Sequence, residues 1–298
     1  MKKNNTQDNM FHRIRLLCVI ALMLTVAACS SIRFTYNNGD TLLYSWLNAY
    51  VDIDNDQSDF VKRDIDELFH WHRTTQLPDY VQVLQNAQRQ LAGNVTQPEL
   101  MSTYKDIRSR TERLAMKAVP DLADLARSLK PDQLVTLEKK FNSNNEKYRK
   151  KFIKGNVEDR QKQRYKKAME QFDLWFGDFS RDQEAVLRKA SDARPLDNEI
   201  WLEERMRRQQ LILNALRKIQ NEKLSKEATI PVVQGLVRDV FSRMESSERK
   251  AFYDAYLNGT INMIMTAVKI ATPEQKAHAQ KRMQGWIDDF HALAAGKR

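Results

Sequence analysis

Residues 100–118 read LMSTYKDIRSRTERLAMKA, and this stretch decides the fold class. A clear stripe recurs in alternating steps of four and three, at Leu100, Tyr104, Ile107, Thr111, Leu114 and Ala118. Such spacing puts all of them on one face of a single helix, as a long helix of a bundle requires. Pro120 has no backbone N–H, so it should kink or end this helix.

Similar stripes recur on both sides of this helix. They predict helices around residues 43–50, 61–72, 80–91, 134–152, 165–179, 202–216, 233–241, 252–256 and 279–290. With only 8 Gly and 7 Pro in 298 residues, turn-rich β folds, Rossmann folds and P-loops are disfavoured. A charged fraction of 30% and a mean hydropathy of −0.65 exclude a polytopic membrane protein. The sequence therefore predicts an all-α, multi-helix bundle of about ten helices.

The first 28 residues are typical of a secretory signal peptide. Basic residues precede an uncharged apolar run from Leu16 to Ala28, which is shorter than the roughly 20 residues needed to span a bilayer. The run ends in Val26-Ala27-Ala28-Cys29, which resembles the bacterial lipobox, in which the cysteine is lipidated and becomes the new N-terminus. We therefore expect lipidation at Cys29. The alternative is an ordinary signal peptide or short anchor in which Cys29 is incidental.

The two cysteines, Cys18 and Cys29, both lie in this N-terminal segment. Cleavage would leave no free thiol, which excludes disulfides, cysteine-ligated zinc and thiol nucleophiles. Several acyl chains, each contributing about 0.8 kcal/mol per buried methylene, would make the anchoring effectively permanent. Ser30 follows the cysteine, and by resemblance to Gram-negative lipoproteins this favours the periplasmic face of the outer membrane.

The mature chain divides by pattern into a tether and two helical regions. Residues 29–39 are the expected lipidated tether, and the alternation of Ile32, Phe34 and Tyr36 with polar residues predicts an extended segment with one packed face. Helical patterning covers residues 40–190 and 196–298, and Pro195 forbids a helix between them. The pattern leaves open whether these regions are two domains or one.

A short motif recurs at irregular spacing, with the order apolar, cap-like, any, acid, Gln. It occurs at residues 53–57, 129–133, 179–183 and 271–275, with a near relative at 96–99. Such a pattern is typical of a capping box, in which the cap side chain and the Gln or Glu satisfy each other's backbone N–H groups at a helix start. It also resembles the LTxxQ signature of small helical periplasmic stress proteins and chaperones.

One further order of motifs carries a family resemblance. Trp46-Leu47-Asn48-Ala49-Tyr50-Val51-Asp52 is followed by Trp71-His72-Arg73 and then by Leu77-Pro78-Asp79-Tyr80. This order resembles a family of proteobacterial lipoproteins whose domain has no known function. The resemblance implies an envelope lipoprotein and supplies no activity.

The run His70-Trp71-His72-Arg73 is the most suggestive for chemistry. Residues two apart on a helix point about 200° away from each other, so His70 and His72 cannot chelate one metal ion. We expect His72 to be packed and hydrogen-bonded, with Trp71 and Arg73 bracing the next helix through Tyr80. The alternative is a binding pocket that His72 forms with Asp52 and Asp54. No metal and no cofactor is predicted.

Residues 147–167 carry ten basic and two acidic side chains, with aromatic residues interleaved. Export from the cytoplasm argues against nucleic acid, and an anionic lipid, lipopolysaccharide or an acidic protein remain as candidate partners. The candidate residues are Lys150, Lys151, Lys166 and Lys167. We favour a solvated basic helix face for this segment, because its aromatic residues fit the core stripe. The same interpretation applies to Arg205, Arg207 and Arg208 and to the acid pairs Glu203-Glu204 and Asp288-Asp289.

No HExxH motif, nucleophile elbow or Gly-rich phosphate loop occurs in the sequence. We therefore expect a non-enzymatic protein for binding or envelope maintenance, anchored to the outer membrane. Two alternatives remain, a helical periplasmic chaperone and a cell-wall or lipid-modifying enzyme. The sequence does not define the oligomeric state.

Overall fold

The computed structural model describes residues 32–296, and the expected signal peptide and Cys29 lie outside this range. The described residues contain no strand, which confirms the all-α class, with twelve helices against the predicted ten or so. These helices are α2 (Gly39–Val51), α3 (Asn55–Trp71), α4 (Leu77–Ala92), α5 (Gln97–Lys117), α6 (Val119–Ser128), α7 (Pro131–Tyr148), α8 (Val157–Phe176), α9 (Arg181–Asp192), α10 (Asn198–Asn221), α11 (Lys226–Ser246), α12 (Lys250–Ile270) and α13 (Pro273–Ala294). Helix α5 ends just before Pro120, as its sequence predicts.

Two of the junctions are π-helical. Residues His72–Gln76 (η1) join α3 to α4 without a loop, although the sequence pattern predicts two separate helices there. Residues Arg149–Ile153 (η2) extend α7 in the same way. Among the described residues, none of the helices combines the length and apolarity needed to cross a bilayer.

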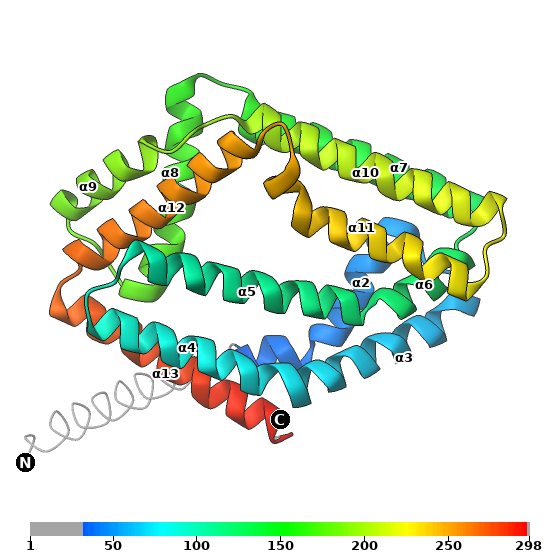
Figure 1. The fold of residues 1–298 in the computed structure, drawn as a ribbon, viewed down its shortest axis with the longest axis horizontal. Coiled ribbons are helices and arrows are strands. Elements are labelled where there is room, and N and C mark those ends of the chain that lie inside the picture. Colours follow the sequence, from blue (N-terminus) through cyan, green and yellow to red (C-terminus); the bar gives the residue numbers. More distant parts are fainter. Residues whose placement is uncertain (1–31, 297–298) are drawn as a thin grey trace, which may run out of the picture.

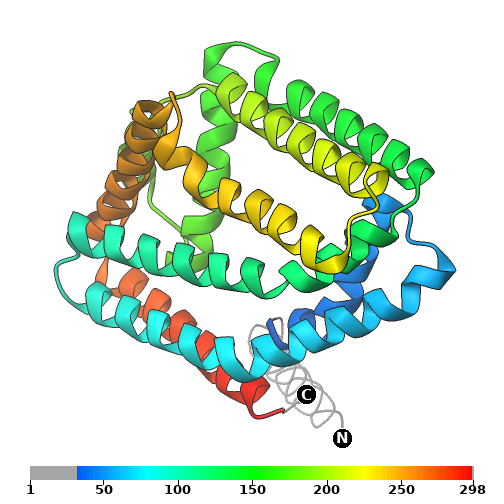
Figure 2. The same cartoon turned by 45° about the vertical axis from the view of Figure 1, so that its right-hand side comes forward.

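The helices form a four-sided frame (Figure 1). Helices α4 and α13 pack together along one edge, and α7 and α10 pack along the opposite edge. One of the two remaining sides is formed by α2, α3 and α6, and the other by α8, α9 and α12 (Figures 1 and 2). Helices α5 and α11 run through the middle (Figure 1). The predicted boundary at residues 191–195 is a break between α9 and α10. Several helices before this break pack on helices after it.

The frame consists of two halves with the same helix order, α2–α7 and α8–α13. In the first half α2 packs on α3 and α7, and in the second half α8 packs on α9 and α13. Helices α3 and α6 pair in the first half as α9 and α12 do in the second. Each half also places one helix on the other, because α4 packs on α13 and α10 packs on α7. The fold therefore consists of two similar six-helix units, each of which packs one of its helices on the other unit.

A buried glutamine pair closes the first half. Nε2 of Gln57 donates to the Ser128 carbonyl oxygen at 2.7 Å, and Nε2 of Gln133 donates to the Asp52 carbonyl oxygen at 2.8 Å. The two side-chain amides also bond to each other, at 3.1 and 2.7 Å. Each Oε1 accepts the N-cap N–H of its own helix, so both glutamines complete capping boxes.

The second half has the same arrangement. Nε2 of Gln183 donates to the Ile270 carbonyl oxygen, Nε2 of Gln275 donates to the Asp178 carbonyl oxygen, and the two amides bond to each other. In both halves the accepting carbonyl lies five residues before the partner glutamine. The four Gln-containing repeats of the sequence are thus two structural clamps, and the repeat that suggested a chaperone is accounted for by packing.

The clamp explains why these positions are Gln. Only an amide can accept the N-cap N–H and also donate to a carbonyl on the partner segment, because an ionised Glu has no donor. The near relative at Thr96 has Glu99 instead, and Glu99 is exposed and bonds only within its own capping box. A glutamate suffices where no second helix start has to be joined.

The apolar core is divided in the same way as the frame. One cluster contains Val61, Ile65 and Leu134 of the first half together with Leu213 of α10. A second cluster contains residues of α8, α9, α12 and α13 together with Leu91 of α4. Each half therefore completes its core with a helix of the other half.

Residues 32–37 are helical, so the prediction of an extended segment over Ile32, Phe34 and Tyr36 is wrong. Side chains two apart on a helix face opposite sides, and the period of two does not survive. Tyr36 packs edge-on against Phe69, with ring centroids 5.6 Å apart, whereas Phe34 is 71% exposed.

Candidate anion-binding site

The basic segment predicted from the sequence forms a hollow between η2 and the first half of α8. Six lysines line it, namely Lys150, Lys151, Lys154, Lys162, Lys166 and Lys167. The hollow also includes Gly155, Asp159 and Glu170 and has a volume of about 570 Å³. We call it the lysine hollow. The four lysines selected from the sequence all belong to it.

The turn between η2 and α8 brings these lysines together. The N–H of Lys154 donates to the Arg149 carbonyl oxygen and closes η2. Gly155 follows with a φ of +96°, in the region where a side chain would be strained. The Asn156 side chain then accepts the Asp159 N–H and caps α8. The chain reverses within three residues, so lysines on both sides of the turn face the same space.

Most of the charge in the hollow is not neutralised. Lys167 pairs with Glu170 at 2.5 Å, while the other five lysines make no ion pair within residues 32–296. The hydrogen bond from Lys167 lowers the pKa of Glu170, and the charges of Lys166 and Lys151 act in the same direction. Six ammonium groups against two carboxylates leave the hollow at about +4, which suits a ligand with several anionic groups.

The three arginines of the basic segment have structural partners, whereas Lys147 lies exposed outside the hollow. Arg149 pairs with Glu146, and Arg160 pairs with Glu199. Arg164 donates to the carbonyl oxygens of Arg194 and Pro195, at 3.1 and 2.7 Å. Tyr148 and Phe152 stack against each other at 4.8 Å and are only partly exposed. The segment therefore divides into a packed set of arginines and aromatics and an exposed set of lysines.

The residues of the Trp-His-Arg motif form a separate cluster with the N-terminal segment. Nδ1 of His72 lies 2.8 Å from the Tyr36 hydroxyl, and Arg73 donates to the Asn37 side-chain oxygen. The His72 ring also meets Tyr80 edge-on, with centroids 5.3 Å apart. Burial lowers the pKa of His72 and raises that of Tyr36 to about 12. Both groups are neutral at pH 7 and suit a packed junction.

Other residues of that motif belong to the same junction. Trp71 lies under Lys117, with Nζ 5.9 Å from the ring centroid, and Asp79 pairs with Arg110 at 2.9 Å. Asp52 and Asp54 are not part of it, because α3 separates them from His72 by seventeen residues, or about 25 Å. The alternative pocket of His72 with these aspartates does not form. Within the described residues, no group of three or more His, Cys, Asp or Glu side chains could hold a metal ion.

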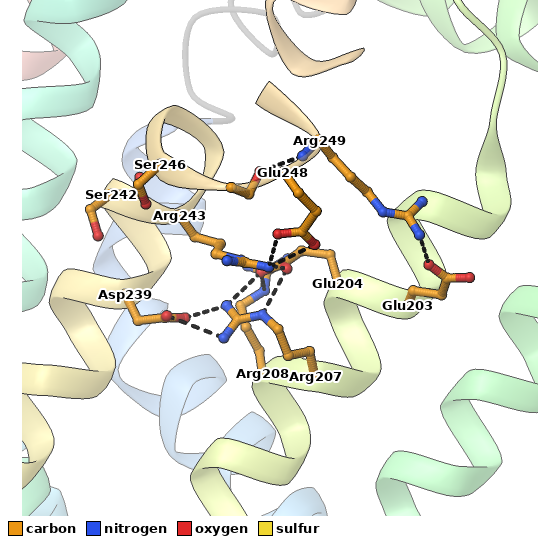
Figure 3. A network of polar contacts seen from close by, with 11 residues as sticks. Glu203, Glu204, Arg207, Arg208, Asp239, Ser242, Arg243, Ser246, Glu248 and Arg249 are labelled. Carbon is orange, nitrogen blue, oxygen red and sulfur yellow. Dashed lines mark hydrogen bonds and ion pairs between the residues drawn. The ribbon is translucent and has the colours of Figure 1, made fainter. Parts of the chain in front are cut away.

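Within residues 203–208, Glu203 is exposed as expected, but Glu204 and the three arginines are not a solvated face, which corrects the sequence interpretation for these four. Glu204 is buried, with 7% of its surface exposed, and pairs with Arg207 at 2.8 Å and with Arg208 at 3.4 Å. Arg207 also bonds to Asp239 of α11, so the network ties α10 to α11 (Figure 3). Arg205 lies over the Tyr148 ring at 5.9 Å.

The pair Asp288-Asp289 needs the same correction at its second residue. Asp289 is 2% exposed and accepts a hydrogen bond from Arg33 Nε at 2.7 Å. Burial raises the pKa of this carboxyl, against the opposing effect of Arg33. Neighbouring acids in the sequence thus have different environments, and only the folded chain distinguishes them.

The fold and the lysine hollow define a class of protein, an internally duplicated, all-helical body with an exposed polycationic concavity. The chain belongs to the DUF6279 family, a family of unknown function, whose model matches residues 49–228, more than half of its length. That range includes the Trp-His-Arg motif and the whole lysine hollow. No curated protein and no solved structure matches the chain.

Proposed function

We propose that this protein is a lipid-anchored envelope protein, held at the periplasmic face of the outer membrane, that binds phosphate-bearing polyanions in its lysine hollow. The observation that carries the proposal is the group of six lysines around one concavity, five of them without an ion pair in the described part of the chain. Binding of this kind needs positive charge that a ligand in solution can reach, and it needs no catalytic group.

The anchor is supported by the lipobox-like sequence ending at Cys29. Cys29 is three residues before the first described residue, Ile32, and three residues reach at most about 11 Å. The helical residues that follow are fixed to the body by the ion pair between Arg33 and Asp289 and by the hydrogen bond between Tyr36 and His72. A lipid on Cys29 would therefore hold this corner of the frame close to the membrane.

The lysine hollow lies at a different corner. The turn between η2 and α8 is on the opposite edge of the frame from α13, and the 20 residues of α8 span about 30 Å between them (Figures 1 and 2). This geometry favours a phosphate-bearing ligand that approaches from the periplasm over simple contact with the anchoring leaflet.

A charge-reversal experiment tests the binding site. We expect Lys150→Glu, Lys151→Glu, Lys166→Glu and Lys167→Glu together to weaken binding to lipopolysaccharide or anionic vesicles about 1000-fold at low salt, from about 1 kcal/mol per lysine near an anionic surface. The matched control reverses four exposed lysines elsewhere, Lys105, Lys139, Lys189 and Lys281, and changes the net charge equally. Equal losses in both variants would show a non-specific charge effect and contradict the proposed site.

A comparison of three probes distinguishes the possible sources of the bound anion. The probes are lipopolysaccharide, vesicles of anionic phospholipid and vesicles of neutral phospholipid. Binding in the hollow should fall between about 20 mM and about 200 mM salt, because the Debye length shortens from about 20 Å to about 7 Å. Equal affinity for neutral and anionic vesicles at both salt concentrations would refute anion binding and leave a solvated helix face.

A separate experiment tests the anchor. Cys29→Ala should prevent maturation at this site and the incorporation of labelled fatty acid. Label retained by the variant would show that the lipid is attached at another residue.

A further inference from the structure

The outward face of the N-terminal helices carries no charge. Its exposed residues are Phe34, Thr35, Asn38, Thr41, Leu42, Ser45, Trp46 and Ala49, at the spacing of one continuous helical face. The backbone bonds from Asn38 N to Phe34 O and from Leu42 N to Asn38 O continue the helix across the join at residue 38. We call these eight residues the uncharged stripe. It is about 23 Å long, from 1.5 Å per residue over fifteen steps.

The stripe also carries the three most exposed large hydrophobic side chains of the described residues. Phe34, Leu42 and Trp46 are 71%, 56% and 55% exposed, more than any other large hydrophobic residue in residues 32–296. The opposite face of α2 already packs in the first core through Leu43 and Leu47. The stripe therefore has no role in the core, although 30% of the residues in this chain are charged and could have occupied it.

We propose that the uncharged stripe lies on the surface of the bilayer into which the acyl chains of Cys29 insert. The inference rests on the proposed anchor. Cys29 is five residues before Phe34, so the stripe begins at most about 17 Å from the anchor along the chain. Exposed Trp and Phe beside small hydroxyl side chains suit the boundary between headgroups and acyl chains, and a face without charge enters it at low cost.

The contact would orient the whole body. A single flexible anchor leaves the frame free to rotate, whereas an anchor followed by a 23 Å line of contact fixes α2 along the membrane plane. Tyr36 and Arg33 lie in the helical residues 32–37 that lead into α2, and they bond to His72 of η1 and to Asp289 of α13. The orientation of the stripe is therefore passed to η1 and α13. The stripe and the lysine hollow would then act at different distances from the membrane.

Site-directed spin labelling tests the proposal, because a processed chain has no free cysteine once Cys29 is acylated. The full anchored protein is reconstituted in neutral phospholipid vesicles with a nitroxide at Leu42→Cys, and separately at Phe34→Cys. The matched control carries the nitroxide at Val186→Cys, on α9, which is exposed to a similar degree at 45%. Collisions with oxygen, which concentrates in lipid, are compared with collisions with a water-soluble nickel chelate. Mass spectrometry of the same samples measures the acyl content of Cys29.

We expect the ratio of oxygen to nickel collisions to be severalfold higher at positions 34 and 42 than at position 186. Acylated Cys29 with equal ratios at the three positions would overturn the stripe contact and leave the anchor intact. Absence of acyl chains would overturn the anchor and the contact that depends on it. Shielding of position 42 from both reagents in detergent solution without vesicles would overturn the proposal in favour of a protein partner or a second copy.

Discussion

Replacement of Gln133 by Ala should be among the most destabilising single changes in the first half of the frame. The side chain is 2% exposed and takes part in four hydrogen bonds, which join it to Asp52, Lys130 and, in both directions, Gln57. At about 1 kcal/mol net for each bond, the variant should lose about 4 kcal/mol of unfolding free energy. Alanine is the better helix former, so propensity acts in the opposite direction and does not produce the loss.

The loss is measured by urea unfolding followed by far-ultraviolet circular dichroism, with the slope checked for constancy. Gln97→Ala is the matched control, because Gln97 also lies at a helix start but is exposed and makes only one long contact, to Asn258 at 3.4 Å. Its cost should be under about 0.5 kcal/mol. In a double-mutant cycle, Gln57→Ala and Gln133→Ala should be strongly non-additive, because the second change removes contacts already lost. If Gln133→Ala costs no more than Gln97→Ala, the clamp does not stabilise the fold.

Glu204→Gln should cost about 3 kcal/mol, because it removes the buried carboxylate charge shared by Arg207 and Arg208 and leaves Arg207 with Asp239 alone. The same change at the exposed neighbour, Glu203→Gln, should cost under about 0.5 kcal/mol, and equal effects in thermal or urea unfolding would contradict the burial argument. His72→Ala should lower the melting temperature, and His70→Ala, at an exposed position, should be nearly silent. Burial lowers the pKa of His72 below 6.5, so the unfolded chain takes up a proton that the folded chain refuses, and the free energy of unfolding should fall as the pH drops below about 6.5. His72→Gln should remove part of that fall, and a pH profile that matches the unsubstituted protein would show that His72 does not titrate across folding.

Local features of this chain could be predicted because they depend on neighbours in the sequence. The residues from Leu100 to Ala118 form most of α5, and Pro120 follows its end. The stripe itself is not buried, because Tyr104, Ile107 and Thr111 are exposed and no residue of α5 is buried. The Gln-containing repeats are helix starts, as the capping pattern indicates, because a capping box involves residues only three apart. The lysines of the basic segment share one surface because a single short turn separates them.

Features that depend on distant residues could not be predicted in this way. Nothing near Gln57 in the sequence indicates that its amide meets Gln133, 76 residues later. The burial of Glu204 beside exposed Glu203 depends on α11, which the pattern of α10 does not contain. The helical state of residues 32–37 was missed because alternation over five residues fits a strand as well as a short helix with one packed residue per turn.

The exchange of helices between the two halves has a consequence for how the chain is made. Helix α4 packs on α13, which is the last of the described helices in chain order. The apolar side of α4 must therefore wait for about 180 further residues before its partner exists. A chain that emerges N-terminus first spends that interval partly folded, with exposed apolar surface that is prone to aggregation. Premature stops within α11 or α12 should accordingly give a protein that is degraded or aggregates as a whole, and not a stable first half.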